Sequence, residues 1–127
     1  MNKEEMKSRT KKYALRVIKA VQALPNDRVG NVLGSQLLRS GTSVGANYRA
    51  VCRAKSAADF QNKLKIVEEE CDESLFWMEL LVESGVMTLR KLGELMKEGD
   101  EILRMVVAAL KRHAKATKQL ASIHETR

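Results

Sequence analysis

The sequence has 127 residues and a net charge of +7, a length that favours a single domain spanning residues 1–127. No apolar run approaches the roughly 18 residues of a membrane-spanning helix, and the N-terminus lacks the apolar stretch of a secretion signal. The two cysteines match no paired motif, which excludes a disulfide framework and predicts a cytoplasmic protein with reduced thiols. With 4% aromatic residues and no alternation of polar and apolar positions, the chain is expected to be all-α with an aliphatic core.

The first predicted helix covers residues 4–24. Its apolar residues recur at the spacing of one helix face: Met6, Tyr13, Val17, Val21 and Leu24. Pro25 ends this helix, because the residue before a proline avoids the α conformation. Asn26 and Asp27 then supply a cap for the next helix.

The second predicted helix, residues 28–54, runs through a Gly- and Ser-rich segment whose composition alone favours a loop. Core-type positions keep steps of four and three from Leu33 to Val51, and a loop would have no reason to preserve that phase. Ser40 and Asn47 fall on this stripe. Because a buried amide must find partners, we expect these two residues to form a buried polar layer that fixes the register of the helices.

The rest of the chain predicts two further helices, at residues 57–84 and 89–115. Ser56 and Asp59 have the spacing of a capping box at the start of the third helix. Residues 116–127 are expected to fray. Four amphipathic helices with short connections pack most simply as an antiparallel up-down four-helix bundle.

The third predicted helix carries more apolar residues than one buried face requires. Four of them are interpreted as a surface for self-association: Ile66, Phe76, Trp77 and Leu80. An isolated bundle would leave these side chains in water, whereas a symmetric homo-oligomer, such as a ring, would cover them. The alternative is a wide core face in which Trp77 lies under a loop.

Charge is segregated along the chain. Residues 1–58 carry 12 Lys and Arg against 3 Asp and Glu, residues 59–101 carry 5 against 12, and residues 102–127 carry 6 against 1. Seven cations form stripes on the first two predicted helices: Arg9, Lys12, Arg16, Lys19, Arg39, Arg49 and Arg53. The planar guanidinium can bind two phosphate oxygens at once, so the stripes predict contact with the backbone of RNA or DNA. Solvated helix faces, or salt bridges between subunits, are the alternatives.

The sequence contains no pattern typical of a catalytic, metal or cofactor site. The acidic run Glu68–Glu70 lacks the Glu-x-x-His pairs of bundle metal sites, since neither histidine has a glutamate three residues before it. Neither cysteine has a histidine nearby in the sequence, and no glycine-rich phosphate loop is present. We therefore expect a protein that is not an enzyme and that binds no metal and no cofactor.

A resemblance to a known family rests on two segments, QLLRSGTSVGANYRA (residues 36–50) and DFQNKLKIVEEECDESLFWMELL (residues 59–81). They resemble the four-helix-bundle family associated with intervening sequences in bacterial 23S rRNA genes, whose members are also labelled S23 ribosomal proteins. The most specific part is the pattern Arg-Ser-x-x-Ser-Val-x-x-Asn, which begins here at Arg39. Many members continue after its Asn with a Glu-Gly pair. This chain has Ala50 and Val51 instead, as in a divergent branch.

This resemblance implies an antiparallel four-helix bundle that assembles as a ring-shaped homopentamer. It also implies similarity to the accessory variability protein of diversity-generating retroelements, a basic pentamer that works with a reverse transcriptase and its RNA. For most of the family no biochemical activity is established.

Two functions follow as hypotheses from the sequence, and neither involves a membrane. The first is a non-catalytic oligomer that binds RNA or DNA through its basic stripes. The second is a protein–protein adaptor, or an accessory subunit of a nucleic-acid enzyme such as a reverse transcriptase.

Overall fold

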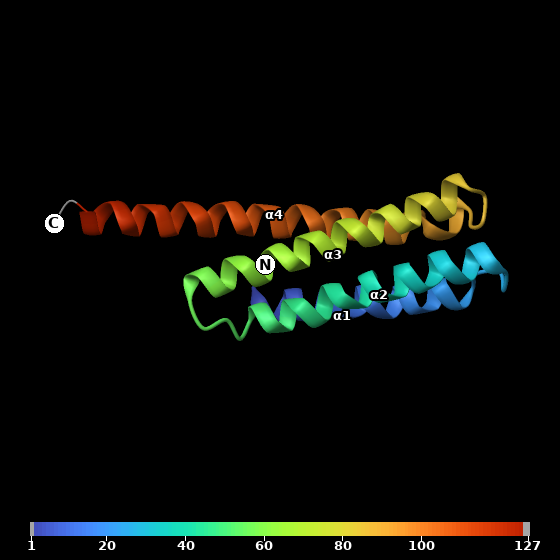
Figure 1. The fold of residues 1–127 in the computed structure, drawn as a ribbon, viewed down its shortest axis with the longest axis horizontal. Helices are drawn as coiled ribbons and strands as arrows, with labels where there is room; N and C mark the ends of the chain where they lie inside the picture. The colour runs from blue at the N-terminus through green and yellow to red at the C-terminus, as the bar shows by residue number, and fades with distance from the viewer. Residues whose placement is uncertain (1, 126–127) are drawn as a thin grey trace.

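Four α-helices run up and down the long axis of the computed structural model, which describes residues 2–125 (Figure 1). They are α1 (Lys3–Gln22), α2 (Arg28–Val51), α3 (Ala57–Glu83) and α4 (Leu89–Glu125). Each helix packs against the next one, and α1 also touches α4 through a smaller contact. Residues 2–125 contain no strand, so the predicted all-α class is confirmed and the chain folds as a helical bundle.

Side-chain caps begin α2 and α3 where the sequence supplies them. An Asp27 carboxylate oxygen accepts the backbone N–H of Gly30 at 2.8 Å. Ser56 Oγ accepts the N–H of Asp59 at 3.0 Å, as the capping-box spacing predicts. The Asp59 carboxylate reaches back to the N–H of Lys55 at 3.0 Å, so both short connections are held at the start of the following helix.

α2 is one uninterrupted helix through the segment whose composition resembles a loop, as the spacing predicts. The glycines of this segment allow α1 to pack closely against α2. A Cβ on Gly41 would lie 2.8 Å from the Val17 side chain, and one on Gly45 would lie 3.2 Å from the carbonyl oxygen of Thr10. α2 ends at Val51, three residues before its predicted end, in a turn of i→i+3 hydrogen bonds.

A chain of buried hydrogen bonds links three helices near the centre of the bundle. The Ser74 hydroxyl donates to the carbonyl oxygen of Cys71 at 2.7 Å. The Tyr13 hydroxyl, 2.8 Å from Ser74 Oγ, is therefore the donor in that pair. Cys71 Sγ donates in turn to the carbonyl oxygen of Gly99 at 3.3 Å. These bonds connect α1 to α3 and α3 to α4.

The predicted polar layer of Ser40 and Asn47 does not form across the helices. Ser40 is buried, but its hydroxyl donates to the carbonyl oxygen of Gln36 at 2.9 Å. Asn47 is half-buried, and its side-chain amide donates to the carbonyl oxygen of Ser43 at 2.8 Å. Both side chains bond one turn back within α2, a local alternative that short polar residues readily adopt in helices.

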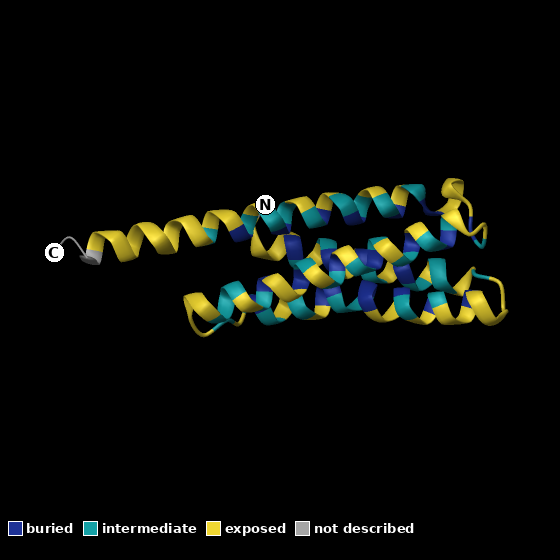
Figure 2. Cartoon of the chain, turned by 45° about the horizontal axis from the view of Figure 1, so that its top comes forward, coloured by how far each residue is buried: buried dark blue, intermediate teal, exposed yellow. Residues whose placement is uncertain are grey.

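Aliphatic side chains fill the space around the buried hydrogen bonds, as the low aromatic content predicts. The largest fully buried ones include Leu37, Leu64, Met78, Leu81 and Ile102. Figure 2 shows the buried residues along the facing sides of the helices and the exposed residues along their outer sides.

α4 extends past the other three helices as a solitary helix (Figure 1). We call residues 111–123 the α4 arm, in which residues 114–123 are all exposed (Figure 2). The prediction of a frayed tail is wrong for residues 116–125, which are helical, and residues 126–127 lie outside the described residues. The helix continues because no glycine or proline interrupts it after Gly99, and because the packed part of α4 already provides the nucleus.

Candidate nucleic-acid interface

Arg9, the first cation of the predicted stripe on α1, is bound by carboxylates of α4. Its Nε and Nη2 donate to the two carboxylate oxygens of Glu98, each at 2.7 Å. Nη2 also donates to Glu101. Arg9 therefore joins α1 to α4, and its donors are not free for a phosphate. The spacing of cations along α1 contains no information about acids on a distant helix.

This ion pair shifts the pKa of both partners. Hydrogen bonding to Glu98 raises the pKa of Arg9 above its ordinary value, although partial burial opposes the shift. The hydrogen bond from Arg9 lowers the pKa of Glu98, also against the effect of burial. Both groups consequently carry full charge near neutral pH.

Arg39 is also paired within the chain. Its guanidinium donates to Glu70 at 3.2 Å and to Glu73, both on α3. The Arg39 side chain is 49% exposed, so solvent weakens this pairing. The alternative of salt bridges to the acids of the third helix thus applies to Arg39, but inside one chain rather than between subunits.

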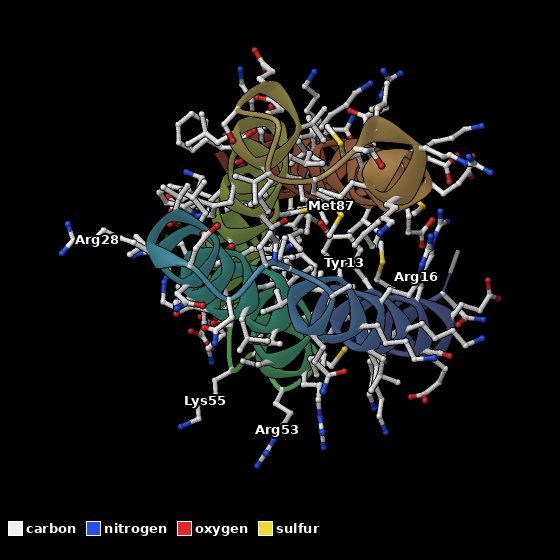
Figure 3. All side chains as sticks on the ribbon, turned by 90° about the vertical axis from the view of Figure 1, so that its right-hand side faces the viewer. Tyr13, Arg16, Arg28, Arg53, Lys55 and Met87 are labelled. Atoms are coloured by element: carbon white, nitrogen blue, oxygen red, sulfur yellow. The ribbon has the colours of Figure 1, made fainter. Side chains whose placement is uncertain are left out.

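A groove between α1 and α4 collects three cations that start far apart in the sequence. Its volume is about 300 Å³. Arg16 and Lys19 of α1 lie along it with Lys91 of α4, beside a single carboxylate, Glu94. Figure 3 looks along the bundle from the end with the α1–α2 connection and shows Arg16 at this gap, with Met87 opposite. We call this feature the α1–α4 groove.

A second groove, of about 570 Å³, lies on the other side of α1, against α2. Lys7, Lys11 and Arg49 line it, and Lys7 makes an exposed ion pair with Glu4 at 3.4 Å. Glu4 also lines it, and the other lining residues are small: Ser8, Ala14, Thr42, Gly45 and Ala46. Because these side chains are short, a large ligand can approach the helix backbones closely. We call this feature the α1–α2 groove.

Most of the predicted cations are exposed and have no acidic partner. The exposed cations that make no ion pair within residues 2–123 include four on α1, two at or just after the end of α2 and one at the start of α4: Lys11, Lys12, Arg16, Lys19, Arg49, Arg53 and Lys91. We call this set the α1 surface. It contains five of the seven cations that the sequence predicts and leaves out Arg9 and Arg39.

Sequence reasoning missed three of the groove cations. Lys7 and Lys11 are four residues apart, and Ala14 follows three residues later, so the helical spacing alone could have placed the two lysines on one stripe. Lys91 could not have been found in this way. It joins Arg16 only because the start of α4 packs beside the end of α1.

The predicted self-association residues lie on the outer side of α3. Ile66 and Phe76 are 42% and 48% exposed, whereas Trp77 and Leu80 are half-buried. The Phe76 and Trp77 rings meet edge to face with centroids 5.1 Å apart. Val29 on the adjoining helix α2 is 50% exposed. These five residues, with the 57% exposed Val32, form what we call the apolar patch.

The described part of the chain shows no arrangement for chemistry at Cys71 or at a metal. Burial raises the pKa of Cys71 to about 12, so its thiol stays protonated and unreactive near neutral pH. Among the described residues, no three histidine, cysteine, aspartate or glutamate side chains lie together as metal ligands would. No helix within residues 2–125 has the length and apolar character to cross a membrane.

The fold and this surface define a class of protein: a helical bundle whose distinguishing feature is an array of exposed cations. The chain belongs to the 23S rRNA-intervening sequence protein family, whose model matches residues 2–108. The family resemblance of the sequence is therefore confirmed. No enzyme family is indicated by this match.

A solved structure shares this fold at 33% sequence identity and a TM-score of 0.81. It is a protein of unknown function from the S23 ribosomal protein family of Bacteroides thetaiotaomicron, and the match covers 87% of this chain and 99% of that one. No curated protein matches the chain. The family match ends at residue 108, before the α4 arm begins.

Proposed function

We propose that this protein is a non-catalytic homo-oligomer that binds the phosphate backbone of nucleic acid along the α1 surface. The observation that carries the proposal is that the seven exposed cations of the α1 surface make no ion pair within residues 2–123, and that five of them line the two grooves beside α1. Like charges that lie close together repel one another, which opposes the compact state. A polyanion would neutralise them and release its counterions, which favours binding.

The expected mode is contact with phosphates rather than with bases. Single-strand base readout needs aromatic side chains that are free to stack. Tyr13 is fully buried and Tyr48 is 9% exposed, and no aromatic residue lines either groove beside α1. Binding through this surface should therefore depend weakly on nucleotide sequence and strongly on salt.

Self-association through the apolar patch is the second part of the proposal. Phe76, Val29 and Val32 are each about half exposed, and several large apolar side chains left in water on a small protein favour a contact surface. A ring of identical subunits, as the family resemblance implies, would cover the patch and repeat the α1 surface around the assembly. The repeated charge would strengthen phosphate binding beyond what one subunit achieves.

The test is a titration of labelled single-stranded RNA and duplex DNA across a salt series, read by fluorescence anisotropy. We expect the logarithm of the binding constant to fall linearly with the logarithm of salt concentration. In the triple variant Arg16→Gln, Lys19→Gln, Lys91→Gln, which removes the charges of the α1–α4 groove, the slope should shrink by about 2 to 3.

The matched control removes three exposed cations that line neither the α1–α4 groove nor the α1–α2 groove, with Arg28→Gln, Lys55→Gln and Lys65→Gln. Figure 3 shows Arg28 and Lys55 pointing into solvent away from Arg16. The control should bind nucleic acid nearly as well as the wild type. If both triple variants lose the same affinity for nucleic acid, binding depends on the net charge of the protein and not on the α1–α4 groove. No binding by the wild type at low salt would end the nucleic-acid proposal and favour the adaptor.

A further inference from the structure

The α4 arm is the one long element of the protein that lies outside the matched family body. The family model ends at residue 108, and the arm comprises residues 111–123. At 1.5 Å per residue, these thirteen residues extend for about 20 Å. Figure 1 shows the outer part of α4 leaving the bundle and extending beyond the start of α3, with no other helix beside it.

The part of the arm nearest the bundle is rich in positive charge. Four cations lie within eight residues: Lys111, Arg112, Lys115 and Lys118. No aspartate or glutamate occurs between Glu101 and Glu125, and within residues 2–123 none of the four cations makes an ion pair. At helical spacing, Lys111, Lys115 and Lys118 share one face. All four side chains are exposed.

The root of the arm is fixed to the bundle by His113. Its ring stacks on Phe60, with centroids 4.4 Å apart and planes at 29°. Its Nδ1 lies 2.7 Å from Oε1 of Gln61. The Gln61 amide donates to the carbonyl oxygen of Leu110 at 3.5 Å. These contacts hold the direction in which α4 leaves the bundle, so the arm is presented as a formed helix.

We propose that the α4 arm is a docking element for duplex DNA and lies in its major groove. The major groove of B-form DNA is about 12 Å wide and admits an α-helix, whose diameter with side chains is about 10–12 Å. The short side chains of Ala114, Ala116 and Ala121 keep the arm slim between its cations. The major groove of A-form RNA is too narrow and deep for a helix. The arm should therefore distinguish the two duplexes.

The apolar content of the arm argues against a lipid surface as its ligand. Helices that lie on membranes carry broad apolar faces rich in aromatic residues and leucine. The arm has no tryptophan, phenylalanine or tyrosine, and its only large aliphatic residues are Leu120 and Ile123. Four cations with little apolar surface suit a groove lined by phosphates better than a bilayer.

The proposal rests on the proposed function for its ligand class, but it uses a separate surface, so the two can fail independently. The arm variant is Lys111→Gln, Lys115→Gln, Lys118→Gln, because glutamine keeps helix propensity while removing charge. The probes are a B-form DNA duplex and an A-form RNA duplex of the same sequence, titrated across a salt series. Circular dichroism and solution mass verify that the variant keeps its fold and assembly.

We expect the arm variant to lose DNA binding with a salt slope reduced by about 3, and to bind the RNA duplex like the wild type. The triple variant of the α1–α4 groove should lose affinity for both duplexes. Equal losses of the arm variant on both duplexes, or no loss on DNA, would overturn the arm proposal while leaving the α1 surface intact. If the groove variant binds both duplexes as tightly as the wild type, the proposed function is contradicted instead.

A second readout locates the arm on the DNA. Guanine N7 faces the major groove, so dimethyl sulfate methylates it only where that groove is open. The wild type should protect guanines in the bound duplex, and the arm variant should leave them reactive at equal occupancy. Vesicles of anionic lipid serve as the last probe. If the arm variant loses vesicle binding but protects guanines like the wild type, the ligand is a lipid surface and the DNA proposal is wrong.

Discussion

Gly99 lies on α4 where the Tyr13 hydroxyl comes closest to that helix. A Cβ at this position would lie 2.7 Å from the Tyr13 hydroxyl oxygen and 2.9 Å from a methyl group of Leu75. Gly93, six residues earlier on the same helix, has no such neighbour: its nearest contact would be Leu89 at 3.8 Å. The packing of the helices therefore requires a glycine at position 99 but not at position 93.

We predict that Gly99→Ala lowers the free energy of unfolding and that Gly93→Ala raises it. Overpacking at Gly99 should cost about 1–3 kcal/mol, more than the gain in helix propensity, because the buried Tyr13 ring has no room to retreat. At Gly93 the alanine should stabilise by about 0.5–1 kcal/mol. Urea unfolding followed by circular dichroism measures both. Stabilisation by both substitutions would mean that α4 is less closely packed at Gly99 than the structure shows.

At the scale of the elements, the contact between α1 and α4 includes the ion pairs that Arg9 makes with Glu98 and Glu101. These two helices touch less than the other neighbouring pairs, and Arg9 bridges them through its bidentate bond to Glu98. The same contact borders the α1–α4 groove, in which Arg16 and Lys91 come from the two helices. The position of the groove cations is therefore coupled to the Arg9–Glu98 pair.

The Arg9–Glu98 ion pair makes the stability of the bundle sensitive to acid. The folded protein holds the pKa of Glu98 below that of the unfolded chain, which is about 4.3. The pair therefore stabilises fully above that unfolded value, and its contribution is lost as the pH falls through the lower folded pKa. We predict that Glu98→Gln melts at a lower temperature at pH 7 and loses less stability than the wild type below about pH 4.

Thermal unfolding from neutral to acidic pH tests the prediction. The control is Glu79→Gln, which changes an exposed carboxylate of α3 that makes no ion pair within residues 2–123. That variant should follow the wild type at every pH. Parallel curves for Glu98→Gln and the wild type would show that the ion pair contributes nothing to the acid response.

At the scale of the whole molecule, charge and apolar surface are separated. Most cations of the α1 surface lie on the first helix or line the grooves beside it, whereas the apolar patch lies on α2 and α3. Such a separation allows one face to contact other subunits while another stays open to a polyanion. The α4 arm adds a third surface that leaves the bundle altogether (Figure 2).

We predict that Phe76→Asp converts the oligomer into smaller species. Phe76 is 48% exposed, so the substitution places a charge in the apolar patch without opening the core. Light scattering coupled to size-exclusion chromatography measures the mass. Lys97→Asp, an exposed change on α4, should leave the mass unchanged. If Phe76→Asp keeps the mass of the wild type, the apolar patch is not the contact between subunits.

Several features of the fold could be predicted from local patterns alone. Apolar spacing locates all four helices, and the caps at Asp27 and Ser56 follow from short motifs. Two predictions, the polar layer across the helices and the frayed end of α4, are wrong because local interactions within one helix are sufficient. The Ser40 hydroxyl donates to a carbonyl oxygen of its own helix. The end of α4 stays helical because its residues are good helix formers and no glycine or proline follows Gly99.

The sequence by itself determined the helical class, the family and the overall excess of cations, because these depend on composition and on spacing within one helix. Only the tertiary structure decided which cations remain available. Arg9 and Arg16 lie two helical turns apart on the same stripe. Glu98 of α4 binds Arg9, whereas Arg16 lines a groove with Lys91 and Glu94 and makes no ion pair within residues 2–123. The reason is physical: an ion pair requires two charges within about 4 Å, and that distance is set by the packing of helices far apart in the chain.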